Sequence, residues 1–205
     1  MAPAPAKIAD QAEIIPANFF APLDFESIYG RIAPVEVDLG CGDGSYLVAA
    51  AGANPARNFL GIERMAGRVR SACRKIELGD VNNARILRCE ISYAVGQMLP
   101  AKSVNVFHLM FPDPWPKRRH APRRVVTESF LTLLHRALAP QGTVRIATDE
   151  TDYFREIERL SFRSPEFVAI REPEAPIAAS TFEKRFRQDG LQIHRIVLEK
   201  ASDGT

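Results

Sequence analysis

The 205-residue sequence contains only three cysteines, at positions 41, 73 and 89, and it has no Cys-x-x-Cys pair. An odd number of cysteines without paired spacing argues against a disulfide framework and against a zinc site. No grouping of Asp, Glu, His and Cys has metal-ligand spacing, so we expect no metal. His108 and His194 lie within strand-like runs and are expected to be structural. The sparse, unpaired cysteines favour a reducing, cytoplasmic setting.

Long apolar runs are also lacking. No apolar signal-like segment follows Met1, and no stretch approaches the length of a membrane span. We therefore expect a soluble protein without a membrane partner. The formal net charge is only +2, but basic residues concentrate at 117–124 and 184–187. Such an uneven distribution favours a polyanionic partner.

The length fits one α/β domain and is too short for two ordinary ones. Residues 1–22 are rich in Ala and Pro, and we expect them to form a flexible N-terminal segment. The remainder, 23–205, is then a single domain.

Strand and helix patterns alternate through most of this domain, which predicts parallel strands joined by helices. The last two strands have no helix between them, so they are expected to pair antiparallel. The sequence thus predicts a mostly parallel, seven-stranded sheet with an antiparallel end. The expected strands are 35–39, 59–63, 84–89, 104–110, 143–148, 167–170 and 193–198; the clearest helices are 45–52, with Ser45 as a possible cap, 124–138 and 151–162.

The most informative segment is Phe111-Pro112-Asp113-Pro114-Trp115-Pro116, which follows the apolar strand 104–110. Three prolines fix φ and remove backbone donors, so Asp113 and Trp115 stand on a stiff support at a strand end. A carboxylate and an indole, followed at once by positive charge, suit a nucleic-acid base that is read, stacked and anchored through phosphates. The positive charge comes from Lys117, Arg118, Arg119, Arg123 and Arg124, with His120 among them.

Acidic residues stand at the carboxyl ends of successive expected strands: Asp38, Glu63, Glu90, Asp113 and Asp149. In a sheet of strand–helix repeats these ends share one edge, where ligands bind. Like charges there repel one another unless a cation or several hydrogen-bond donors occupy the crevice. The pattern therefore favours a ligand that is cationic or rich in donors.

A glycine loop, Gly40-x-Gly42-x-Gly44, follows the first strand and opens a helix, so that the backbone can approach a ligand closely. A dinucleotide cofactor is the usual competitor. That fingerprint requires a third glycine where Ser45 stands, and Asp38 and Asp43 would repel a pyrophosphate.

S-adenosyl-L-methionine fits the acidic crevice better than a dinucleotide does. It has no phosphate, it carries an ammonium and a sulfonium, and its ribose diol needs an acceptor. Glu63, at the end of the second strand, is placed for that diol, and Glu90, at the end of the third, is placed near the adenine. We therefore expect S-adenosyl-L-methionine as the cofactor.

These residues resemble the tRNA (guanine-N7-)-methyltransferase family. The run Asp38 to Gly44 is similar to the first motif of most Rossmann-type methyltransferases, and 59–63 narrows the choice. The segment Phe111 to Trp115, with Lys117 and the arginines after it, is highly specific to this family. Ala147-Thr148-Asp149 and Ser180-Thr181-Phe182-Glu183 also match. The resemblance spans about Leu23 to Lys200.

The resemblance implies a Rossmann-like S-adenosylmethionine-dependent methyltransferase fold. It implies transfer of a methyl group to N7 of a tRNA guanine, at position 46 in the variable loop. Asp113 is then the catalytic residue. The late segment usually reads Thr-Lys-Phe-Glu, so Thr181 lacks the usual cation. The implied cofactor contacts are Asp38, Glu63, Glu90 and Asp113, to which the glycine loop adds Gly40 and Gly42. The implied substrate contacts are Lys117, Asp149, Ser180, Thr181, Phe182 and Glu183, to which the basic and stacking pattern adds Trp115, Arg118, Arg119 and Arg123.

Two alternatives remain open on the residues alone. A Rossmann-type methyltransferase acting on a small molecule or a protein side chain accounts for the glycine loop and Glu63, but it leaves the cationic residues 117–124 without a role. A non-catalytic RNA-binding module accounts for those cations, but it leaves the acidic strand ends unexplained.

Overall fold

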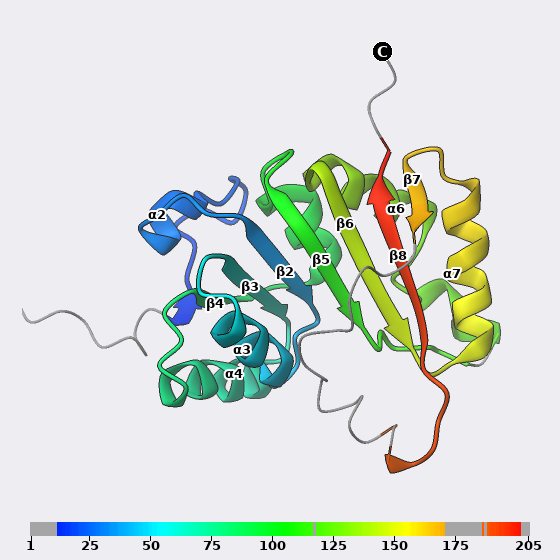
Figure 1. The fold of residues 1–205 in the computed structure, drawn as a ribbon, viewed down its shortest axis with the longest axis horizontal. Helices are drawn as coiled ribbons and strands as arrows, with labels where there is room; N and C mark the ends of the chain where they lie inside the picture. The colour runs from blue at the N-terminus through cyan, green and yellow to red at the C-terminus, as the bar shows by residue number, and fades with distance from the viewer. Residues whose placement is uncertain (1–11, 117, 171–185, 187, 202–205) are drawn as a thin grey trace, which may run out of the picture.

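The computed structural model describes residues 12–116, 118–170, 186 and 188–201. Its centre is an eight-stranded sheet in the order β1-β4-β3-β2-β5-β6-β8-β7 (Figure 1). All neighbouring strands from β1 to β6 are parallel, whereas β8 is antiparallel to both β6 and β7. The strands are β1 (Glu13–Ile14), β2 (Val35–Leu39), β3 (Asn58–Glu63), β4 (Ala84–Arg88), β5 (Val104–Met110), β6 (Leu138–Thr148), β7 (Phe167–Ile170) and β8 (His194–Lys200).

Helices cover both faces of the sheet. α3 and α4 pack with one face around Tyr46, Leu47 and Ile76. η1, α6 and α7 pack on the other around Phe130 and Tyr153. The helices are α2 (Phe25–Tyr29), α3 (Ser45–Ala53), α4 (Ala66–Leu78), α5 (Ile91–Tyr93), the π-helix η1 (Ala94–Met98), the 3₁₀ helix η2 (Arg118–Arg123), α6 (Glu128–Ala137) and α7 (Thr151–Arg163).

The predicted architecture is confirmed, with one strand more than expected. β1 lies within the segment 1–22 that we expected to be flexible, yet Glu13 and Ile14 pair with Ile86 and Leu87 of β4. Ala12 beside them is fully buried. The sequence signal failed because a two-residue strand has no periodicity to detect. Residues 1–11 lie outside the described part of the chain.

Helix starts also differ from expectation. Gly44, in the left-handed region at φ 74°, precedes α3 as its cap, and Ser45 is the first helical residue. α6 begins only at Glu128, where the Thr127 hydroxyl accepts a hydrogen bond from the Phe130 amide at 3.2 Å. A side-chain cap therefore sets this boundary, later than the apolar spacing predicted.

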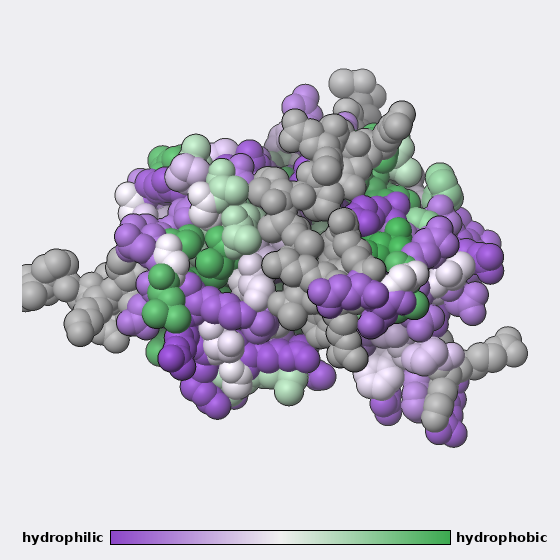
Figure 2. All heavy atoms as spheres, turned by 60° about the horizontal axis from the view of Figure 1, so that its bottom comes forward, coloured by the Kyte–Doolittle hydropathy of each residue, from purple (hydrophilic) through white to green (hydrophobic). Residues whose placement is uncertain are grey.

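The strand order reverses between β2 and β5, which are direct neighbours. Such a switch point leaves a crevice at the carboxyl ends of the parallel strands, where ligands of open α/β sheets bind. These ends lie along the lower edge of the sheet in Figure 1, and Figure 2 brings that edge forward, with hydrophilic side chains prominent on the visible surface.

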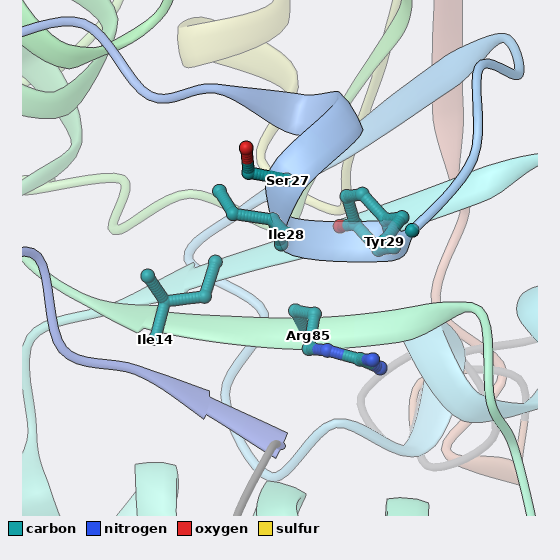
Figure 3. Close-up of a pocket in the computed structure, with 6 residues that line it drawn as sticks. Ile14, Ser27, Ile28, Tyr29 and Arg85 are labelled. Carbon is teal, nitrogen blue, oxygen red and sulfur yellow. The ribbon is translucent and has the colours of Figure 1, made fainter.

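A separate hollow of about 460 Å³ lies beside β1 and α2 (Figure 3). Arg85, near the amino end of β4, reaches past the ring of Tyr29, with its guanidinium carbon 5.5 Å from the ring centroid. The hollow is therefore not part of the carboxyl-end edge. Within the described residues, no helix is long and apolar enough to cross a membrane.

Candidate active site at the carboxyl ends of the strands

The glycine loop turns sharply at the end of β2. The amides of Gly40 and Cys41 both donate to the Ile62 carbonyl of β3, at 2.8 and 3.1 Å. Gly40 has φ 75°, which favours glycine, and a Cβ there would meet no atom within 4 Å. At Gly44 a Cβ would lie 2.7 Å from the Cβ of Ala72 in α4. The loop thus packs tightly against α4 at Gly44 and leaves free space beside Gly40, where a ligand can approach the backbone.

Asp38 is the most unusual carboxyl group of this edge. It is only 4% exposed, and no donor in the described part of the chain hydrogen-bonds to it. Burial, together with the negative charge of nearby Glu63, raises the pKa of Asp38 to about 7. A buried carboxyl group without a partner fits a cationic ligand such as the ammonium of S-adenosyl-L-methionine.

Glu63, at the end of β3, is also buried. Its Oε1 accepts from the Met65 amide at 2.8 Å, and its Oε2 lies 3.8 Å from Nη1 of Arg68. The first bond fixes the side chain at the start of α4. One oxygen remains weakly engaged, which suits the predicted bond to a ribose diol.

The remaining acidic residues are more open to solvent. Glu90 is exposed and caps α5, where its Oε2 accepts from the Tyr93 amide at 2.8 Å. Asp149 is half-buried and directly follows β6. Both lie at the predicted edge, as does Asp113 beyond β5.

Asp113 is exposed and sits in a loop with two strained residues. Phe111 has φ 55° and Trp115 has φ 43°, in a region that non-glycine residues rarely adopt. The Phe111 amide donates to the Ala147 carbonyl of β6 at 2.7 Å, which ties the loop to the neighbouring strand. Strain of this kind persists only where surrounding contacts impose it, and it is common at functional sites.

Trp115 is half-buried and already has aromatic and cationic neighbours. The guanidinium carbon of Arg123 lies 4.9 Å from the indole centroid, and His120 meets the ring edge-on at 5.8 Å. Arg119 donates from Nε to Nε2 of His120 at 3.2 Å. Arg123 and His120 thus contact the tryptophan directly, and Arg119 is linked to it through His120.

The contacts of Asp43 weaken one argument that we used against a dinucleotide cofactor, namely that this carboxylate would repel a pyrophosphate. Its Oδ2 lies 2.5 Å from Nζ of Lys75 in α4, and Lys75 also donates to Ser45 Oγ at 2.6 Å. The pKa of Asp43 is lowered, because these hydrogen bonds outweigh the opposing effect of partial burial. The pair weakens the expected repulsion of a pyrophosphate. The pair was not predicted from the sequence, because Lys75 and Asp43 lie 32 positions apart.

His108 is buried and structural, as predicted. Its Nε2 pairs with Oε2 of Glu36 at 2.7 Å, and its Nδ1 lies 3.0 Å from the Tyr46 hydroxyl of α3. Burial would raise the pKa of Glu36, but His108 and Arg57 outweigh it and hold the pKa below its usual range. The network joins β2 and β5 to the helix that follows the glycine loop.

Several predicted contacts cannot be placed. Lys117 and the segment 180–183 lie outside the described residues, as does the side chain of Arg118. Among the described residues, no three His, Cys, Asp or Glu side chains gather as a metal site would require. The absence of a metal stays a prediction.

Comparison with known proteins decides the family. A family model described as "Putative methyltransferase" matches residues 32–196. A tRNA (guanine-N(7)-)-methyltransferase of Halorhodospira halophila is 33% identical over 187 residues, which cover 88% of this chain and 81% of that protein. One from Thermotoga maritima is 31% identical over 202 residues, covering 97% of this chain and 64% of the longer relative.

The chain belongs to the tRNA (guanine-N7-)-methyltransferase family. Solved structures agree on the fold: a SAM-dependent methyltransferase from Aquifex aeolicus has a TM-score of 0.58 at 15% identity, and each chain is 82% covered. A 16S rRNA methyltransferase, KamB, has a TM-score of 0.60 at 16% identity, with 86% of this chain and 91% of that one covered. The predicted family, fold class and methyl-donor cofactor are therefore confirmed; the individual site residues stay predictions.

Proposed function

We propose that this chain transfers the methyl group of S-adenosyl-L-methionine to N7 of a guanine in tRNA, at position 46 of the variable loop. One observation carries the proposal. The family-specific loop with Asp113 leaves β5, and the glycine loop leaves β2, so the base-reading and cofactor-binding segments start from adjacent strands at the switch point.

Asp38 and Glu63 would hold the cofactor from the carboxyl ends of β2 and β3, which are neighbouring strands. Asp38 offers a buried carboxyl group to a cation, and Glu63 offers an oxygen to the ribose diol. Gly40 and Gly42 leave room for close approach of the ligand to the backbone, since a Cβ at either meets nothing nearer than 3.9 Å. Glu90, exposed at the start of α5, completes the row near the adenine.

The bound cofactor supplies a methyl group on a positively charged sulfur, and guanine N7 attacks it with an in-plane lone pair. The protein therefore needs no base to activate the nucleophile, and positioning is its main contribution. Asp113 stabilises the positive charge that develops on the purine. It also accepts hydrogen bonds from N1–H and N2–H of guanine, an arrangement that adenine cannot match.

The rest of the site favours a folded RNA as substrate. N7 lies on the major-groove edge, which is deep and narrow in A-form RNA, so the guanine must be splayed from a loop. Arg119 and Arg123 of η2 are exposed and follow the Asp113 loop directly, so they can meet the phosphates beside that base. Asp149 lies on the same edge. A tRNA substrate favours a cytoplasmic location.

Incubation with labelled S-adenosyl-L-methionine and unmodified tRNA tests the proposal. Nucleoside analysis should find the label in 7-methylguanosine. Transfer to a small molecule or a protein instead of tRNA would contradict it. Cofactor binding without any transfer to tRNA would contradict it as well.

A further inference from the structure

Arg124 differs from nearby Arg119 and Arg123, because its side chain is mostly buried whereas theirs are exposed. It is only 12% exposed. Its Nε donates to the Pro114 carbonyl at 2.8 Å, and its Nη1 pairs with Oε2 of Glu156 in α7. Its guanidinium carbon also lies 4.8 Å from the ring centroid of Tyr153. The sequence grouped this residue with the exposed Arg119 and Arg123 as part of a phosphate-binding surface.

The first of these contacts holds the loop of the proposed active site, and the other two tie that loop to α7. Pro114 lies between Asp113 and Trp115. The hydrogen bond from Arg124 therefore fixes the Pro114 carbonyl, immediately before Trp115, whose φ of 43° is strained. Glu156 belongs to α7, which begins two residues after Asp149. Tyr153 of α7 is fully buried, and its hydroxyl accepts from the Val126 amide at 3.2 Å.

From this geometry we propose that Arg124 is a positioning residue that braces the Asp113–Trp115 loop against α7 and so sets where Asp113 meets the guanine. The proposal rests on the proposed function and adds a residue that nothing else assigns. A planar guanidinium can serve all three partners at once, one through Nε, one through Nη1 and one through its face. A lysine keeps the charge but offers a single ammonium, so it cannot replace the brace.

The protein contains one tryptophan, so its fluorescence reports on this loop alone. In Arg124→Lys and Arg124→Gln we expect red-shifted emission and increased acrylamide quenching of Trp115, without any substrate present. Glu156→Gln should cause the same changes to a smaller extent. Arg159→Gln is the matched control, since Arg159 is an exposed arginine of α7, and it should leave the emission unchanged.

Kinetics complete the test. A misplaced Asp113 should lower kcat for methyl transfer on the order of 10–100-fold in both Arg124 variants. The calorimetric affinity for S-adenosyl-L-methionine should change less than kcat, because Asp113 is the one proposed cofactor contact on the loop that Arg124 holds through Pro114.

Three outcomes would overturn the brace: unchanged Trp115 emission, altered emission with wild-type kcat, or wild-type kcat in Arg124→Lys with loss only in Arg124→Gln. The last would show that charge alone matters. If an Arg124 variant does not fold, Glu156→Gln is judged by the emission and kcat criteria. Failure of the proposed function is seen separately, as absence of tRNA methylation by the wild-type protein.

Discussion

Asp38 combines burial, an acidic neighbour and the lack of a hydrogen-bond donor within the described residues, and together these raise its pKa to about 7. In the free protein it is therefore largely protonated below that pH, whereas a cationic ligand favours the ionised form. Binding of S-adenosyl-L-methionine should then release a proton at mildly acidic pH.

The first prediction concerns the pH dependence of cofactor affinity. Between about pH 5.5 and 7 the affinity should rise by up to about tenfold per pH unit, because less work is needed to deprotonate Asp38. Calorimetry in buffers with different ionisation enthalpies measures both the affinity and the proton release. Asp38→Asn should bind more weakly and without this slope. A wild-type affinity that is flat over this range would contradict the role of Asp38.

The raised pKa of Asp38 also predicts that the stability of the free protein depends on pH. The folded-state pKa lies above the unfolded value of 3.8, so the unfavourable burial of charge develops as pH rises from about 4 to about 7. Over that window the free energy of unfolding of the wild type should fall relative to Asp38→Asn, by up to ~1.4 kcal/mol per pH unit. Denaturant titrations at several pH values measure the difference. If the difference in the free energy of unfolding between the two proteins did not depend on pH, burial would not raise the pKa of Asp38.

A third residue-scale prediction concerns Asp113. Asp113→Asn should fold normally because the residue is exposed, and methyl transfer should be almost lost while cofactor affinity changes less. The amide has no negative charge to stabilise the cationic purine, and one of its two polar atoms is a donor. Single-turnover transfer to tRNA and cofactor calorimetry provide the two readouts. Full turnover by the Asn variant contradicts the assigned role.

At the scale of elements, η2 brings together groups with different tasks. Arg119 and Arg123 are exposed and face outward around His120 and Trp115, whereas the next arginine along the chain is turned into the protein. Spacing in the sequence could not separate them, because the direction of each side chain depends on the turn of a 3₁₀ helix and on a distant partner in α7.

The prediction for η2 is a salt signature. Each phosphate contact contributes a slope of about −0.7 to −0.9 in log affinity against log salt. Neutralising both Arg119 and Arg123 to Gln should flatten the slope for tRNA binding by about one to two units. S-adenosyl-L-methionine affinity should be unchanged. Filter binding across a salt series measures the slope, and Arg155→Gln together with Arg159→Gln, a pair of exposed arginines on α7, is the control. An unaltered slope in the η2 variant would assign these cations to the solvated surface.

At the scale of the whole molecule, the alternation of apolar strands and amphipathic helices was enough to predict the parallel sheet and its antiparallel end. β2, β5 and β7 match their predicted ranges in the structure because each is a short strand-like run with Pro or Gly close to both ends. β1 was missed, since its pairing depends on β4, more than 70 residues away in sequence. The acidic edge was predicted because parallel strands place their ends together. The Lys75–Asp43 pair and the Glu36–His108–Tyr46 network were not predicted, since only tertiary packing brings the residues of each together.

The most direct test of the central claim follows methyl transfer to a defined position. Wild-type protein is incubated with labelled S-adenosyl-L-methionine and two unmodified transcripts of one tRNA, identical except for guanine or adenine at position 46. Nucleoside analysis should find 7-methylguanosine as the labelled product of the first transcript and no label in the second. Label in another nucleoside, or equal labelling of both transcripts, would contradict the proposed recognition of that guanine by the Asp113 loop.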